Sequence, residues 1–106
     1  MSFRFMRVFV MFDLPVLTAS DRRAYRIFKK QLIKSGFIMM QESIYVKLCL
    51  NATAARVVAD NVRSFKPPKG LVQLMIVTEK QFTSIDYIVG EVNDEYISST
   101  DRMVIV

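Results

Sequence analysis

The sequence contains no histidine, no tryptophan and a single cysteine, Cys49. Without histidine, serine–histidine and cysteine–histidine nucleophile pairs are excluded within this chain, and so is histidine acid–base catalysis. One cysteine excludes an intramolecular disulfide and a zinc site built from cysteines, and we expect Cys49 to be a small buried hydrophobic residue. Any catalysis by this chain must therefore use carboxylates, lysine, tyrosine or a metal ion held by oxygen ligands.

Long hydrophobic runs are also missing. The apolar stretch that ends at Phe12 is too short to cross a bilayer, so the sequence predicts no membrane span or secretory leader and favours a cytoplasmic protein. Of the 106 residues, 52% are hydrophobic, which predicts one folded domain and not a disordered chain. We expect residues 1–80 to form the core of this domain and residues 81–106 to be its C-terminal strand extension.

Positive charge is distributed unevenly along the chain. Fifteen lysines and arginines stand against ten acidic residues, which gives a net charge of +5. Residues 1–50 hold nine basic and three acidic side chains, whereas residues 79–106 hold two basic and six acidic ones. A basic half is typical of proteins that bind a polyanion, most often a nucleic acid, although many basic domains are simply soluble.

Hydrophobic periodicity predicts a series of short elements. Strands are expected at 5–12, 37–40, 43–50 and 71–78, and further strand-like pieces at 85–89 and 103–106. Helices are expected from a Ser20 cap to Lys34 and from an Asn51 cap to Phe65. Because Gln41-Glu42 is a poor turn signal, 37–40 and 43–50 could be one bent strand or a pair joined by a bulge.

The order strand, helix, strand, strand, helix, strand predicts an α+β fold of the ferredoxin-like, split βαβ type, with two helices on one face of an antiparallel sheet. The other face of such a sheet needs cover. We expect the remaining C-terminal strands to supply it by packing on, or pairing with, a second copy of the chain. RNA-recognition modules share this plan and stack bases on exposed sheet aromatics, a role that only Tyr45 could have here.

Asp13 is the acid that suggests chemistry most directly. It follows an apolar strand where the chain leaves the sheet, because Pro15 has no N–H for a strand ladder. A carboxylate there can hold Mg²⁺ or another divalent cation beside a phosphate, since waters and phosphates complete the shell of such an ion. Two-fold symmetry would bring together one Asp13 from each copy. The alternative is structural: Asp13 caps the turn at Leu14 by bonding a local N–H.

The first predicted helix concentrates positive charge on one side. At about 100° per residue, its apolar residues share one face; these are Ala24, Tyr25, Phe28 and Leu32. The opposite face is basic, and on it we predict phosphate contacts for Arg22, Arg23, Arg26, Lys29 and Lys30. Such contacts would give affinity without reading the base sequence. The alternative is an ordinary solvated helix face, and Ile33 on the basic side fits neither pattern.

The order of several short motifs resembles a known family. A strand ending in Phe12-Asp13-Leu14-Pro15 is followed by an arginine-rich helix that closes between Leu32 and Gly36, and then by Gln41-Glu42-Ser43-Ile44-Tyr45. This order and spacing is similar to that of the small CRISPR-associated adaptation nuclease family, the smaller of the two near-universal spacer-acquisition proteins. The stretch Thr78-Glu79-Lys80-Gln81-Phe82 resembles members found beside type II effector nucleases.

The resemblance implies a ferredoxin-like homodimer in which the C-terminal strand of each protomer completes the partner's sheet. It also implies that the dimer joins the CRISPR integrase and holds double-stranded DNA along its basic surface, and that some members cleave RNA or duplex DNA with a divalent metal ion. Asp13 matches the family's metal-binding aspartate, and Arg22 and Arg23 fall near the arginines of its first helix. Met39-Met40 stands before Gln41, where many relatives carry an arginine, and losing that cation weakens the case for efficient cleavage.

Three functions follow from these observations. The leading hypothesis is a dimeric DNA-binding scaffold for spacer integration with accompanying metal-dependent endonuclease activity. The alternative is primarily a metal-dependent endoribonuclease or duplex-DNA nuclease that uses paired Asp13 carboxylates. A third, unrelated possibility is a ferredoxin-like regulatory module that binds a small ligand, which would show weak and salt-insensitive affinity for nucleic acid.

Overall fold

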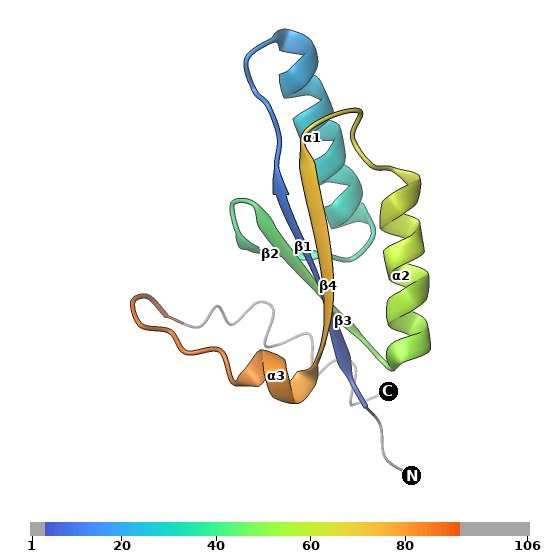
Figure 1. Cartoon of the computed structure of the whole chain (residues 1–106), viewed down its shortest axis with the longest axis vertical. Helices are drawn as coiled ribbons and strands as arrows, with labels where there is room; N and C mark the ends of the chain where they lie inside the picture. Colours follow the sequence, from blue (N-terminus) through green and yellow to red (C-terminus); the bar gives the residue numbers. More distant parts are fainter. Residues whose placement is uncertain (1–3, 92–106) are drawn as a thin grey trace.

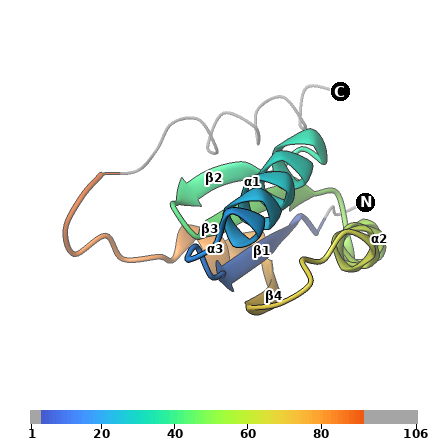
Figure 2. The same ribbon diagram turned by 90° about the horizontal axis from the view of Figure 1, so that it is seen from above.

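The computed structural model describes residues 4–91, which form one antiparallel sheet covered by helices (Figure 1). Its elements are β1 (Met6–Asp13), α1 (Ala19–Lys34), β2 (Ile38–Gln41), β3 (Ile44–Cys49), α2 (Ala52–Ser64), β4 (Leu71–Thr78) and α3 (Glu79–Thr83). The four strands lie in the order β2-β3-β1-β4, and every neighbouring pair is antiparallel. Helices α1 and α2 lie on the same side of this sheet (Figure 2). The α+β class and the βαββαβ order are therefore confirmed.

The first helix begins earlier than the sequence pattern predicts. Its cap is Thr18, not Ser20, so that prediction is wrong. The Thr18 hydroxyl accepts a hydrogen bond from the Asp21 backbone N–H at 3.0 Å, and the Asp21 carboxylate accepts one from the Thr18 N–H at 3.3 Å. This reciprocal capping box satisfies two backbone donors, which a Ser20 cap would not do. The predicted Asn51 cap of α2 is confirmed, because its side-chain oxygen accepts a hydrogen bond from the Ala54 N–H at 2.8 Å.

The main core lies between the sheet and the two long helices. Alternate residues of β1 point into it, and Phe12 is the aromatic centre: its ring lies 5.2 Å from that of Phe28 and 5.7 Å from that of Tyr45. Tyr45 is only 1% exposed, so the suggestion that it stacks bases on an open sheet face is wrong. Cys49 is buried as expected, and desolvation raises the pKa of its thiol.

The two strands of the hairpin are separate elements. The register of the β2–β3 pairing shifts between Met39 and Gln41. Of the two predicted alternatives, the structure therefore has a pair of strands joined by a bulge and not one bent strand. The backbone N–H of Phe12 donates to the Ser43 carbonyl at 3.0 Å, so the hairpin turn is also tied to the end of β1. The hairpin is thus fixed relative to the central strand.

The second sheet face carries a smaller apolar cluster around Phe9, Val46 and Phe82. Phe82 belongs to α3, a helix that the periodicity did not predict although Thr78 and Gln81 form a capping box with the spacing typical of a helix start. The predicted strand at 85–89 is wrong: these residues form no strand, and only Ile85 packs against the cluster. The strand predicted at 103–106 lies outside the described residues.

No helix within residues 4–91 is long and apolar enough to span a membrane.

Candidate functional site

Asp13 is the last residue of β1 and pairs with Leu71, the first residue of β4. Its neighbours Val10 and Phe12 point into the helix-covered core, so alternation along the strand places Asp13 on the opposite sheet face. The side chain is exposed, and among residues 4–91 its carboxylate has no hydrogen-bond or ion-pair partner. The alternative role, a cap bonded to the turn at Leu14, is therefore not the arrangement seen.

The backbone that carries Asp13 is held on both sides. Phe12 is bonded to the hairpin turn as described above, and the loop before β4 approaches from the other side at Gly70. Gly70 has φ +100°, and a β-carbon there would lie 2.9 Å from the Asp13 carbonyl oxygen and 2.7 Å from the Leu14 side chain. Only glycine allows this close approach. The carboxylate is consequently presented from a fixed position.

The side chains near Asp13 that could act as metal ligands decide which metal ion could bind. No group of three or more histidine, cysteine, aspartate or glutamate side chains gathers in the part of the chain that the structure describes. A lone carboxylate supplies hard oxygen ligands, which suit Mg²⁺ and similar hard cations best. One copy of the chain therefore fits a divalent cation only where waters, phosphate oxygens or a second Asp13 complete the shell.

The basic residues of α1 do not all point to solvent. Arg23, Arg26 and Lys30 are exposed and, with Ile27, line an open depression on the helix. Arg22 is exposed too, but its guanidinium donates hydrogen bonds to the backbone carbonyls of the preceding loop at 3.0 and 3.1 Å. The structure thus separates a solvent-facing group from residues that also hold the fold.

Lys29 differs from the other predicted phosphate contacts. It is half-buried, and its ammonium lies 5.2 Å from the centre of the Tyr25 ring, a cation–π distance. Tyr45 lies close enough to feel the same charge, although desolvation is the larger effect and raises the pKa of that phenol. Lys29 is therefore partly engaged inside the molecule.

Sequence reasoning missed an ion pair that joins the start of α1 to the loop before β4. Asp21 is 6% exposed, and its carboxylate lies 3.1 Å from the Lys69 ammonium. The hydrogen bond from Lys69 lowers the pKa of Asp21, while desolvation opposes this shift. The pair ties α1 to the same loop that approaches Asp13. In the sequence, Lys69 stands in a Pro-Pro-Lys-Gly turn, and this pattern does not indicate which acid the lysine pairs with.

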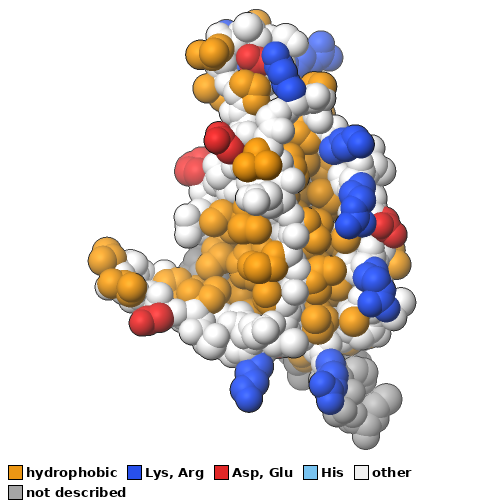
Figure 3. Space-filling view, in the orientation of Figure 1, with side chains coloured by type: hydrophobic (Ala, Val, Ile, Leu, Met, Phe, Trp, Pro, Cys, Tyr) orange, Lys and Arg blue, Asp and Glu red, His pale blue; other side chains and the backbone are white. Residues whose placement is uncertain are grey.

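Apolar and basic surfaces lie side by side around β4. Figure 3 shows hydrophobic side chains gathered along this strand and lysine and arginine side chains along the neighbouring α2 side. On β4, Leu71 is 54% exposed and Met75 is 44% exposed. Exposed cations on the α2 side include Arg56 and Lys66, which the sequence reasoning did not select.

The family model and the relatives that match this chain carry the same family name. The family model described as CRISPR associated protein Cas2 matches residues 6–85. The chain is 48% identical over 101 residues to the CRISPR-associated endoribonuclease Cas2 of Treponema denticola, which covers 95% of this chain and 100% of that protein. It is 43% identical to the protein of the same name from Ligilactobacillus salivarius, over 95% of this chain and 100% of the relative. It is also 43% identical to the one from Streptococcus mutans UA159, over 93% of this chain and 91% of the relative.

Proposed function

The chain belongs to the Cas2 family of CRISPR-associated proteins, and from this premise we propose that it is a homodimeric adaptation subunit that holds double-stranded DNA for the CRISPR integrase. We further propose that it is a phosphodiester endonuclease acting on RNA or duplex DNA; its relatives carry the name endoribonuclease. The observation that carries the proposal is the exposed Asp13 carboxylate, which has no partner among residues 4–91, on a molecule whose first helix presents exposed arginines.

The nuclease site would be built from two copies of Asp13. Each carboxylate would hold Mg²⁺ or another divalent cation, which when bound supplies Lewis acidity toward a phosphate. The contribution of this chain is to fix the carboxylate: the Ser43 carbonyl and Gly70 hold the backbone on either side, so that the side chain is oriented before substrate arrives.

The shape of the sheet edges supports the homodimer. β4 is an edge strand of eight residues paired with β1 without a register shift, whereas β2, the other edge, has four residues and a bulge. Long regular edges accept further strands, and short or bulged ones resist them. We therefore assign β4 as the edge that a strand from the second copy completes.

The DNA-holding role would depend on α1. Arg23, Arg26 and Lys30 are exposed on one helix face and would contact phosphates without reading bases. Arg22 and Lys29 stay candidates for such contacts, although each also has a partner within the chain.

One substitution separates the two activities. Asp13→Asn keeps the side-chain volume and removes the charge that holds a cation. We expect cleavage of RNA and duplex DNA in Mg²⁺ to fall at least 100-fold, while co-purification with the integrase and a short duplex is unchanged. Asp86→Asn, at an acid beyond α3, is the matched control and should cleave normally.

The outcomes are distinct. Spacer acquisition that survives Asp13→Asn in cells, together with abolished cleavage, favours the scaffold as the principal role. Acquisition that stops favours the nuclease. Retained cleavage by Asp13→Asn contradicts the paired-carboxylate site.

A further inference from the structure

Asp21 connects two segments of the chain that flank Asp13. The β1–α1 segment, residues 14–18, follows Asp13 directly, and the α2–β4 loop, residues 65–70, leads into the strand that pairs with Asp13. The two carboxylate oxygens of Asp21 are divided between these segments. Oδ2 accepts a hydrogen bond from the Thr18 backbone N–H at 3.3 Å, and Oδ1 lies 3.1 Å from the Lys69 ammonium.

The α2–β4 loop touches the backbone of Asp13 at the residue that follows Lys69. Gly70 lies so close that a β-carbon on it would be 2.9 Å from the Asp13 carbonyl oxygen and 3.2 Å from Cα of Leu14. Figure 1 shows this loop running from α2 to the end of the sheet at which β1 ends. A shift of Lys69 is therefore passed to the Asp13–Leu14 peptide through the adjacent Gly70.

Packing alone does not fix the distance between the two segments. Gly70 has φ +100°, and glycine adopts either sign of φ easily, so this residue imposes no single course on the loop. A cavity of about 30 Å³ also lies between the segments, lined among others by residues 14–15 and 67–69. Because side chains leave a gap here, where protein interiors are normally filled, the Asp21–Lys69 pair is the contact that joins the two segments.

We propose that Asp21 and Lys69 are positioning residues for the Asp13 carboxylate: their ion pair holds Gly70 against the Asp13–Leu14 peptide and so keeps the carboxylate oriented for a divalent cation. Neither residue touches the cation or the nucleic acid in this arrangement. The inference rests on the proposed nuclease site and adds two residues to it. A ligand that is already oriented does not have to be ordered when the cation binds, so loss of the pair lowers cation affinity.

The test measures the cation requirement of variants of this pair. Lys69→Met removes the ammonium, and Asp21→Asn removes the charge but keeps an oxygen for the Thr18 N–H. We expect each to raise the Mg²⁺ concentration for half-maximal cleavage about tenfold, while cleavage at saturating Mg²⁺ stays close to that of the wild type. The double variant should be no worse than either single one, because residues that act only through each other are not additive. Lys69→Arg keeps a cation in place and should restore the wild-type requirement.

Two further measurements do not depend on cleavage. Mn²⁺ binding to the chain without nucleic acid, followed by electron paramagnetic resonance, should weaken about tenfold in Lys69→Met and in Asp21→Asn. In the metal-free protein, NMR relaxation dispersion should show exchange on the μs–ms timescale at the amides of Asp13 and Gly70 in these variants, and none in the wild type.

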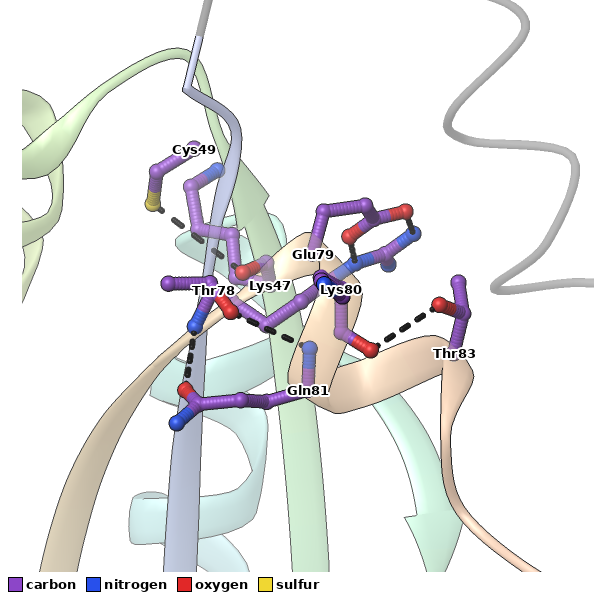
Figure 4. A network of polar contacts seen from close by, with 8 residues as sticks. Lys47, Cys49, Thr78, Glu79, Lys80, Gln81 and Thr83 are labelled. Carbon is purple, nitrogen blue, oxygen red and sulfur yellow. Dashed lines mark hydrogen bonds and ion pairs between the residues drawn. The ribbon is translucent and has the colours of Figure 1, made fainter.

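The matched control is a second ion pair, at the opposite end of β1. Arg7 is 1% exposed and donates hydrogen bonds to the Glu79 carboxylate at 2.7 and 3.0 Å, and the close-up in Figure 4 shows this carboxylate engaged by both bonds. Arg7→Met with Glu79→Leu removes both charges together, so that neither is left unpaired. Its Mg²⁺ requirement and Mn²⁺ affinity should equal those of the wild type, whatever its unfolding temperature. Lys66→Met, in the same loop as Lys69, controls for the loss of one positive charge.

The outcomes separate this inference from the function on which it rests. An unchanged Mg²⁺ requirement in Lys69→Met and Asp21→Asn overturns the inference, and so does an equal rise in the Arg7 and Glu79 double variant. Flat relaxation dispersion at Asp13 in the Lys69 and Asp21 variants overturns it as well. A wild-type chain that cleaves no nucleic acid, and whose Mn²⁺ binding is the same in Asp13→Asn, overturns the proposed nuclease site itself.

Discussion

Two aspartates of this chain have opposite environments, and the difference assigns their roles. Asp21 is buried, bonded to its helix cap and paired with Lys69, so its charge is used to hold two segments together. Asp13 is exposed at a strand end, and no partner for its carboxylate lies within residues 4–91. A carboxylate that already accepts hydrogen bonds from the protein has few oxygen lone pairs left to bind a cation. The oxygens of Asp13 accept none from the described residues and keep their lone pairs available. The sequence singles out Asp13 by its place at the end of a strand, but only burial and contacts show that Asp21 is held by partners within the chain.

The Asp21–Lys69 pair predicts a pH-dependent stability. The Lys69 hydrogen bond holds the pKa of Asp21 below its ordinary value of 3.8, so the folded state binds this proton less readily than the unfolded chain does. The stabilisation is therefore complete above the ordinary pKa and is lost as the pH falls through the lowered one. Lys69→Met should lower the unfolding temperature near pH 6 and lose that difference toward pH 2 in a thermal titration followed by circular dichroism.

Lys66→Met is the matched control for this prediction. Lys66 lies in the same loop, and among the described residues no acidic partner is bonded to it. Its substitution should leave the unfolding temperature unchanged across the range. A Lys69→Met deficit that persists unaltered at pH 2 would show that the effect comes from packing and not from the ion pair.

At the scale of elements, local patterns predicted most of the structure. The long apolar strand β4, the Asn51 cap and the amphipathic helices were all predictable, because hydrophobic period and capping chemistry are local. The wrong Ser20 cap was a local error of two residues, since the cap is Thr18. The other failures have long-range causes. α3 is held in place because Arg7, 72 positions earlier in the sequence, bonds Glu79. Residues 85–89 have strand-like composition but pair with no strand among the described residues. The Asp13 position was predictable from the motif, whereas the Asp21–Lys69 ion pair was not.

Helix α1 carries the prediction for nucleic-acid binding. Arg26→Glu with Lys30→Glu reverses two exposed charges on the face that lines the depression. We expect duplex affinity to fall uniformly across sequences, because phosphate contacts carry no base information. The slope of log K against log salt should become shallower by about 0.9 for each phosphate that the variant no longer neutralises. Fluorescence anisotropy with unrelated duplexes at several salt concentrations measures both effects.

The control for α1 lies on the other side of the sheet. Lys80→Glu changes an exposed cation of α3 and should leave the salt slope unchanged. Equal affinity of the Arg26 and Lys30 double variant and the wild type at moderate salt would count against a role of α1 in holding DNA.

At the scale of the whole molecule, the sheet formed within residues 4–91 has two unlike edges, and this asymmetry decides how two copies can join. The β4 edge is long, regular and apolar at Met75, which is 44% exposed, while Met39 on the β2 edge is 43% exposed but lies at the bulge. The two methionines are therefore matched in type and exposure and differ in the edge they occupy. Met75→Lys should weaken the dimer at least tenfold in sedimentation experiments, because it places a charge where apolar surface would be buried. Met39→Lys should not. The reverse result would assign the dimer to the β2 edge, and it would also leave the Asp13 carboxylates, which lie beside β4, without a reason to meet.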